Sequence, residues 1–376
     1  MDFPASLAKL QQEKTEVLML KESFHQLEKL QEECNEELSN FQRENFIAHE
    51  EFRAITTHLS ESISSFGEKI NSELDTLMLR INHLETIALH AFQINTQKVV
   101  QLPGSHFVAC SQQHIYLAMT NGTIQSFSSH DYSVSGSISP QSYDPLGSYG
   151  KITNMVYTEK LYVGFYSGNI LVFNDWTLMN PSILSYMSTS VTAIHQFGDI
   201  IATGSSNGLV VLWSANTLER LVIFPGHRLS IASIIDDGTD LIIAGRTGIV
   251  TKHDKLCSKQ NDKLQLGNTV HQLFSFQKNR YITLSDKLLV WEGRRTEKTF
   301  DAVEVGKSPL CCIKPPELVL LGSKHSTELK FIYLQSLLFP KVINVLDSPP
   351  LSMLYFGSSF YVLTKNGSVF ILRPGI

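Results

Sequence analysis

The sequence predicts an all-β seven-bladed propeller preceded by a long α-helical coiled coil. Two observations predict this fold class: a short phrase that occurs seven times, and a heptad pattern of apolar residues near the N-terminus. Each phrase joins an apolar run, a small residue and a tight polar turn. The copies start 46, 39, 41, 40, 37 and 42 residues apart, a spacing typical of four-stranded blades in a radial repeat. They begin at Ile115, Leu161, Ile200, Leu241, Tyr281, Leu318 and Phe360.

Charge divides the chain into two parts. Residues 1–95 contain 8 Lys and Arg against 17 Asp and Glu, a net charge of −9, whereas residues 96–376 contain 23 against 19, a net charge of +4. This difference predicts a coiled-coil oligomerisation segment over 1–95 and a propeller over 96–376. A positive excess of this size on the propeller and an acidic helix argue against nucleic acid as a partner.

Apolar residues in the first segment recur in alternating steps of three and four, which is the signature of a coiled-coil seam. If one helix continues for about 85 residues, it is roughly 125 Å long and must pack against another helix, so we expect a homo-oligomer. The alternative is a hairpin that folds back near Gly67, where the pattern slips. The predicted seam contains Val17, Leu20, Phe24, Leu27, Gln31, Leu38, Phe41, Asn45, Phe52, Ile55 and Leu59.

Each repeated phrase is flanked by further short apolar runs bounded by Gly, Asn, Asp or Ser, which predict the remaining strands of each blade. The seventh unit has three predicted strands and ends at Ile376. Residues 96–103, with the sequence TQKVVQLP, can supply its fourth strand. A blade completed in this way closes the ring and leaves few unpaired edges.

The third unit carries the clearest family signature, IIATGSSNGLVVLWSANTLERLVIFPGH, which ends in the dipeptide Gly226–His227. Trp213–Ser214 and Trp291–Glu292 stand where WD repeats have Trp–Asp. Residues 96–376 therefore resemble a divergent WD-repeat propeller, although the family's His–Ser/Thr–Trp–Asp hydrogen-bond network is incomplete in every blade. The resemblance implies a protein-interaction scaffold. An alternative is a substrate-recognition or scaffold subunit of a ubiquitin-ligase or autophagy-conjugation assembly.

Basic residues gather in the predicted turns of the later blades. Arg246, Lys287, Lys324 and Lys365 lie between the second and third strands of blades four to seven, and Arg228 and Lys307 lie in loops between blades. We expect half of one propeller face to be basic and to bind an acidic or phosphorylated peptide through charge-assisted hydrogen bonds. The alternative is that these side chains are ordinary solvated turn residues.

The sequence contains no pattern that predicts catalysis. The five cysteines lack metal-ligand spacing, and there is no nucleophile elbow or phosphate-binding glycine loop. We therefore expect no enzyme activity, cofactor or metal. Without a secretory signal or a membrane-spanning run, the expected compartment is the cytoplasm, with the nucleus as the alternative. Residues 293–296 (GRRT) partly resemble the motif of phosphoinositide-binding propellers, which gives lipid binding as a second alternative function.

Overall fold

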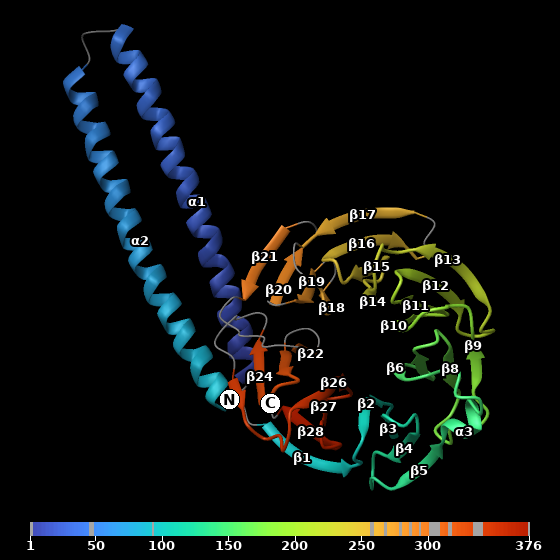
Figure 1. The fold of residues 1–376 in the computed structure, drawn as a ribbon. Coiled ribbons are helices and arrows are strands. Elements are labelled where there is room, and N and C mark those ends of the chain that lie inside the picture. Colours follow the sequence, from blue (N-terminus) through green and yellow to red (C-terminus); the bar gives the residue numbers. More distant parts are fainter. Residues whose placement is uncertain are drawn as a thin grey trace. The chain divides into compact units, whose positions relative to one another are not determined.

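A computed structural model shows the fold of the chain (Figure 1). The chain forms two compact units, Met1–Ala91 and Phe92–Ile376. The structure describes residues 3–44, 49–91, 94–255, 259–266, 269–277, 280–285, 288–292, 295–300, 309–314, 318–333 and 341–374.

The first unit contains two antiparallel helices, α1 (Phe3–Glu44) and α2 (His49–Ala91). The amide of Gln31 donates to the Ser60 hydroxyl across the pair at 2.8 Å. The prediction of one continuous helix was therefore wrong, and so was a fold-back near Gly67. Gly67 lies inside α2, where an added Cβ would stand 2.3 Å from Cζ of Phe24. The glycine thus makes room for a packed ring and does not form a turn.

The residues of the predicted coiled-coil seam fall into two groups in this unit, half-buried and exposed. Val17, Phe24, Gln31 and Leu38 are half-buried between the helices. Five other predicted seam residues are exposed in a single copy of the chain: Leu20, Leu27, Phe52, Ile55 and Leu59. Their packing against another copy stays a prediction. The Phe41 side chain and Asn45 lie outside the described residues. Among the helices that the structure describes, none has an apolar stretch long enough to cross a membrane.

The second unit confirms the seven-bladed propeller, with seven four-stranded antiparallel sheets arranged around a ring (Figure 1). Within each blade the first-named strand lies innermost and the fourth lies outermost. Blades one to four contain β2 (Ser105–Cys110), β3 (His114–Met119), β4 (Ile124–Ser128), β5 (Val134–Ile138); β6 (Ile152–Tyr157), β7 (Leu161–Phe165), β8 (Ile170–Phe173), β9 (Ser182–Leu184); β10 (Val191–Phe197), β11 (Ile200–Ser205), β12 (Leu209–Ser214), β13 (Arg220–Pro225); and β14 (Ile231–Asp236), β15 (Asp240–Gly245), β16 (Ile249–Asp254), β17 (Gln260–Gln265).

Blades five to seven follow the same order, and the last combines both ends of the propeller. In blade seven, β1 pairs antiparallel with β28 from Ile94 opposite Pro374 to Gln101 opposite Ser368. The strands are β18 (Gln272–Gln277), β19 (Arg280–Leu284), β20 (Leu288–Glu292), β21 (Arg295–Phe300); β22 (Pro309–Lys314), β23 (Leu318–Ser323), β24 (Ser326–Tyr333), β25 (Lys341–Ile343); and β26 (Pro350–Phe356), β27 (Ser359–Thr364), β28 (Ser368–Pro374), β1 (Ile94–Gln101).

The small residue in the repeated phrase has a packing role between blades. An added Cβ on Gly164 would lie 2.8 Å from Cβ of Val191, and one on Gly204 would lie 2.6 Å from Cγ2 of Ile231. Val191 and Ile231 begin the inner strands of the next blades. A larger side chain at either position would therefore push neighbouring blades apart.

Candidate functional site

One face of the propeller is built by two kinds of connection. In blade four the first residue of the inner strand, Ile231, pairs with Gly245 at the end of the second strand. In blade seven, Pro350 pairs in the same way with Thr364. The turn after each second strand therefore lies beside the loop that enters the blade. We call the surface formed by these turns and loops the turn face.

Equivalent positions on the turn face are fixed by a repeated backbone hydrogen bond. The N–H of the residue after the second strand donates to the carbonyl just before the inner strand, as in Arg246 to Ser230 and Lys365 to Pro349, both at 2.9 Å. Lys324 follows Ser323, which pairs with the first residue of its inner strand, so it occupies the same position in blade six. The described equivalents are Thr120, Tyr166, Ser206, Arg246, Lys324 and Lys365.

Arg246, Lys324 and Lys365 form a cationic cluster on the turn face. Lys324 is half-buried, and burial lowers its pKa, as do the positive charges of Lys365 and Arg246. Burial and then the charge of Lys324 also lower the pKa of His106, near the start of β2. Lys324 of blade six is therefore close enough to be repelled by Arg246 of blade four and Lys365 of blade seven. None of the three forms an ion pair with a carboxylate among the described residues.

A carboxylate on the same face, Asp347, has its own partners. It pairs with the Lys98 ammonium at 2.8 Å and accepts a hydrogen bond from the Ser368 hydroxyl at 2.8 Å. Burial alone would raise the pKa of Asp347, but these two contacts help to lower it to about 2. Asp347 thus stays ionised while its charge is balanced by Lys98.

Four of the six predicted site residues lie on described parts of the turn face. Arg228 is exposed in the loop that enters blade four, near the backbone contact between Arg246 and Ser230. Lys287 and Lys307 lie outside the described residues, so their prediction is not tested. Sequence reasoning missed His106, because a histidine in an apolar strand gives no sign of a cation on a blade two positions away.

Residues 140–150 form a loop on the turn face between blades one and two, beginning with the short helix α3 (Pro140–Tyr143). The Tyr143 hydroxyl donates to the Gly122 carbonyl at 2.5 Å, and the ring packs near Tyr149 and Phe165. The Asp144 carboxylate accepts hydrogen bonds from the backbone of Ser148 and Tyr149 at 2.9 and 2.7 Å. These contacts hold the loop in one shape while the side chain of Leu146 is 91% exposed.

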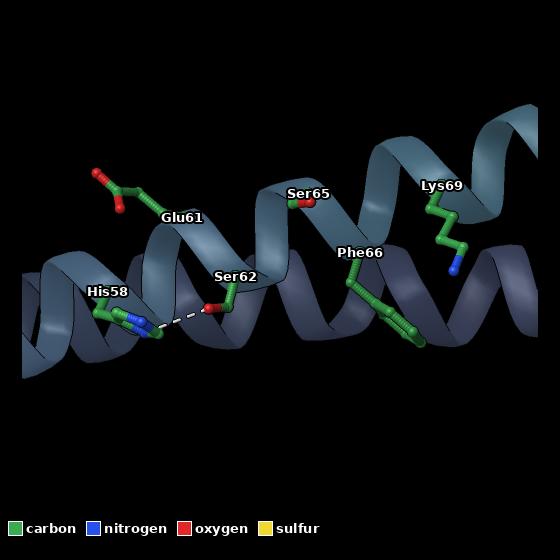
Figure 2. Close-up of a pocket in the computed structure, with 6 residues that line it drawn as sticks. All are labelled: His58, Glu61, Ser62, Ser65, Phe66 and Lys69. Atoms are coloured by element: carbon green, nitrogen blue, oxygen red, sulfur yellow. Dashed lines mark hydrogen bonds between the residues drawn. The ribbon is translucent and has the colours of Figure 1, made fainter.

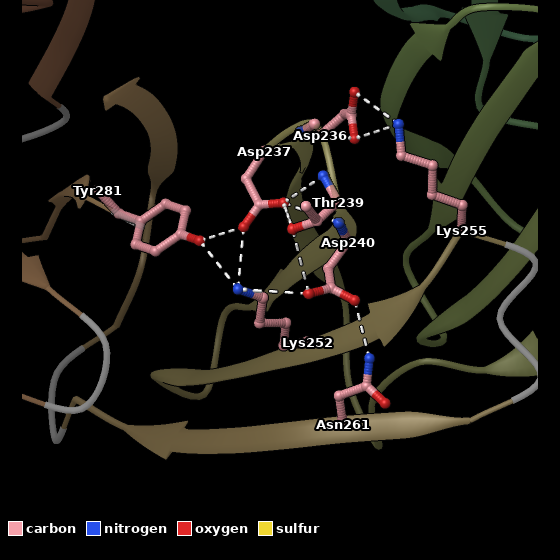
Figure 3. Close-up of polar contacts among 9 residues, drawn as sticks. Asp236, Asp237, Thr239, Asp240, Lys252, Lys255, Asn261 and Tyr281 are labelled. Carbon is pink, nitrogen blue, oxygen red and sulfur yellow. Dashed lines mark hydrogen bonds and ion pairs between the residues drawn. The ribbon is translucent and has the colours of Figure 1, made fainter. Parts of the chain in front are cut away.

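The opposite face carries a second charged cluster, between blades four and five (Figure 3). The Asp237 side chain is fully buried and receives a hydrogen bond from the Tyr281 hydroxyl at 2.5 Å. Lys252 lies 3.0 Å from Asp237 and 3.4 Å from Asp240. Burial alone would raise the pKa of Asp237, but its hydrogen bonds to Tyr281 and Lys252 hold the pKa well below its ordinary value. We call Asp237, Asp240, Lys252 and Tyr281 the interblade clamp.

Side-chain hydrogen bonds link strands inside blades three and four. The Trp213 indole donates to the Thr203 hydroxyl at 2.9 Å. In blade four, His253 takes the place of the tryptophan and lies 3.0 Å from the Thr251 hydroxyl, which lies 3.4 Å from His227. Burial lowers the pKa of both histidines. Trp213, Thr203, Thr251 and His253 are buried and connect strands, whereas His227 is half-buried in the loop that enters blade four.

The described residues show no group of three or more His, Cys, Asp or Glu that could hold a metal ion. A shallow hollow on α2 is lined by six side chains, including His58, Ser62 and Phe66 (Figure 2). His58 and Ser62 are exposed and 3.4 Å apart, and within the described part of the chain no carboxylate pairs with His58. The geometry lacks the third group that orients the base in a nucleophile–base pair.

Comparison with known proteins adds no family assignment. No protein-family model matches the chain, and no curated protein matches it significantly. The likeness to WD repeats therefore depends on the residues of blades three to five and on the propeller fold, a fold that commonly serves as a scaffold for protein interactions.

Proposed function

We propose that the chain is a non-catalytic protein-interaction scaffold whose turn face binds an acidic or phosphorylated peptide. The supporting observation is the cationic cluster. Its like charges lie near one another without a counter-charge, so their electrostatic interaction is unfavourable. A carboxylate or phosphate would relieve this repulsion and accept charge-assisted hydrogen bonds. Thr120, Tyr166 and Ser206 supply uncharged contacts on the other half of the same ring.

Two matched charge reversals test this proposal. Arg246→Glu with Lys365→Glu changes two exposed residues of the cationic cluster, and Lys259→Glu with Lys263→Glu changes two exposed residues at the outer strand of blade four. Fluorescence anisotropy with an acidic phosphoserine peptide library and its unphosphorylated copy measures binding. We expect the first variant to lose at least about tenfold in affinity and the second to stay within about twofold of the parent. Equal affinities in the two variants would exclude the cationic cluster as the site.

The same measurement separates the alternative functions. Vesicles containing phosphoinositides form a second arm, and binding to vesicles without binding to any peptide would favour the lipid-binding alternative. A recognition subunit of a ubiquitin-ligase or autophagy-conjugation assembly would use the turn face for its substrate, so it would show the peptide result. It would differ in having a helical unit that docks other machinery.

We also propose that the helical unit joins copies of this chain. Its support is the set of large apolar side chains that α1 and α2 leave exposed, Leu27 and Leu59 among them. Two propellers held together bind a partner with two acidic motifs more tightly than one, because the second contact forms at high effective concentration. Sedimentation velocity of the intact chain between about 1 and 100 µM tests for a dimer or higher species; a monomer throughout this range contradicts self-association.

A further inference from the structure

The inner seam of the helical hairpin mixes apolar residues with small and polar ones. Gln31 contacts Ser60, and Phe24 contacts Gly67, so residue i of α1 lies opposite residue 91 − i of α2. Leu74 is the one large apolar residue of α2 that is buried among the described side chains. The inward positions of α2 are Thr56, Ser60, Ile63, Gly67, Ile70, Leu74 and Leu77.

A second set of large apolar side chains lies outside this seam, on one side of the hairpin. Leu20 and Leu27 are three residues after Val17 and Phe24, and Leu59 and Phe66 are one residue before Ser60 and Gly67. Three residues forward and one residue back both rotate a side chain in the same sense from the contact line. In an antiparallel pair, equal rotation places both rows on the same side. We call this surface the outer apolar face: Leu20, Leu27, Leu30, Phe52, Leu59 and Phe66.

The rows of the outer apolar face interleave along the hairpin. From the register above, Phe66, Leu59 and Phe52 lie level with positions 25, 32 and 39 of α1. The face therefore extends over positions 20–39, about 28 Å at 1.5 Å per residue. Each of its six side chains is between 56% and 61% exposed. At roughly 100 Å² apiece they offer about 600 Å², close to the roughly 800 Å² that each partner contributes to a stable interface.

We propose that a second copy of the chain covers the outer apolar face, so that two hairpins form a four-helix bundle. This inference rests on the self-association proposed above and specifies its surface. A two-fold axis parallel to the helices sets α1 of one copy antiparallel to α2 of the other and keeps every residue at its own height. Leu20 and Leu27 then interdigitate with Phe66 and Leu59 of the second copy. Large side chains in one row thus meet large side chains of the other row at matching levels.

Charge predicts how this association responds to salt. The first 95 residues carry a net charge of −9, so two copies repel each other at low ionic strength. Salt screens this repulsion and strengthens apolar contact, and the dimer tightens as salt rises. A basic helix from another protein would show the opposite dependence, because salt would weaken its attraction to the acidic unit.

Sedimentation velocity on full-length variants at about 50 and 500 mM NaCl tests the proposal. Leu27→Glu with Leu59→Glu places charges on the outer apolar face. The matched control, Leu18→Glu with Leu79→Glu, changes two equally apolar residues that are 59% and 70% exposed but lie off this face. A milder pair, Leu27→Ala with Leu59→Ala, guards against loss of the helices, which circular dichroism monitors.

The expected result is a parent dimer that tightens with salt, a monomeric glutamate variant, a weakened alanine variant and a dimeric control. A parent dimer left intact by both variants of the outer apolar face would overturn this surface while leaving self-association in place. A parent that stays monomeric at both salt concentrations would overturn both proposals. A dimer that dissociates as salt rises would also overturn the apposition of two acidic hairpins.

Discussion

The two charged clusters of the propeller differ in how their charges are balanced. In the interblade clamp, the buried Asp237 carboxylate meets Lys252 and the Tyr281 hydroxyl, so every charge has a partner. In the cationic cluster, Arg246 and Lys365 add positive charge near Lys324, and the described residues supply no opposing carboxylate to any of the three. The clamp joins two blades through the hydrogen bond from Tyr281 of blade five to the ionised Asp237 of blade four. The cations of the cationic cluster have no carboxylate partner among the described residues, which leaves them free to bind an anion.

The two clusters therefore predict opposite responses to mutation. Removing the Asp237 charge from the interblade clamp takes away the closest counter-charge of the largely buried Lys252, which destabilises the fold. Removing a charge from the cationic cluster relieves repulsion, so the fold keeps its stability while binding is lost. A protein that trades stability for recognition in this way follows a common pattern at binding sites.

The largest expected effect is that of Asp237→Asn. The substitution preserves the shape of the side chain but leaves Lys252 without its closest counter-charge, although Asp240 remains at 3.4 Å. We expect a loss of about 2 kcal/mol in the free energy of unfolding, measured by urea denaturation. Peptide affinity at the turn face should stay unchanged. A loss below about 0.5 kcal/mol would show that the clamp is not a stabilising element.

Acid should weaken the fold through the same carboxylate. The folded-state pKa of Asp237 lies below its unfolded value, so its contribution is fully present above the unfolded pKa near 4 and is lost as pH falls through the folded pKa. Asp347, with a pKa lowered to about 2, adds to the loss between about pH 4 and 2. Unfolding free energies at pH 7 and pH 3 measure this, and the decrease should be smaller in Asp237→Asn. An identical decrease in both proteins would assign acid sensitivity to other groups.

Lys324→Met should not lower the free energy of unfolding, in contrast to Asp237→Asn. Its pKa is lowered by burial and by neighbouring cations, so a neutral side chain of similar length removes an unfavourable charge. We expect the free energy of unfolding to stay equal or to rise by about 0.5 kcal/mol, and affinity for the acidic peptide to fall about tenfold. Destabilisation by more than about 1 kcal/mol would instead make Lys324 a structural residue.

The smallest effect is expected at the partly exposed ion pair beside the interblade clamp. Lys255 lies 3.3 Å from Asp236, and both side chains reach solvent. Such pairs contribute about 0.2–1 kcal/mol, so Asp236→Asn should change the free energy of unfolding by less than about 1 kcal/mol. Measured beside Asp237→Asn, it separates the effect of burial from that of charge. Equal losses would remove this distinction.

The propeller could be predicted from local pattern because every blade repeats the same requirement. Each second strand needs a small residue where the next blade packs, as Gly164 and Gly204 show, and each ends in a polar turn. These requirements recur about every 40 residues and can be recognised in the sequence alone. The fold followed from them even though few tryptophan, aspartate and histidine signature residues are present.

The helical unit was harder to predict because Gly67 has two opposite interpretations. A glycine in a helical pattern often marks an end, since it costs about 1 kcal/mol inside a helix relative to alanine. Here it accommodates the Phe24 ring from the other helix, and that contact lies 43 residues away in sequence. The local sequence around Gly67 does not indicate a contact with so distant a residue. For the same reason it could not distinguish the side chains inside the hairpin from Leu27 and Leu59 outside it.

The candidate site was predictable in part for the same reason. Arg246, Lys324 and Lys365 could be found because each follows a second strand, a position that the repeat defines. The sequence did not show that Arg246 and Lys365 lower the pKa of Lys324, nor that Lys324 lowers the pKa of His106. These electrostatic interactions join different blades of the ring. The interblade clamp was missed because Asp237, Lys252 and Tyr281 belong to different strands and turns.

The pairing of β1 with β28 also has a consequence in time. During synthesis β1 is made 267 residues before β28, from Gln101 to Ser368. At about 5–20 residues per second, β1 waits roughly 13–50 s for the strand that it will join. Throughout this interval its hydrogen-bonding edge is open to other chains. The join that makes the finished ring continuous is thus the last to become available, and the nascent chain must be protected until then.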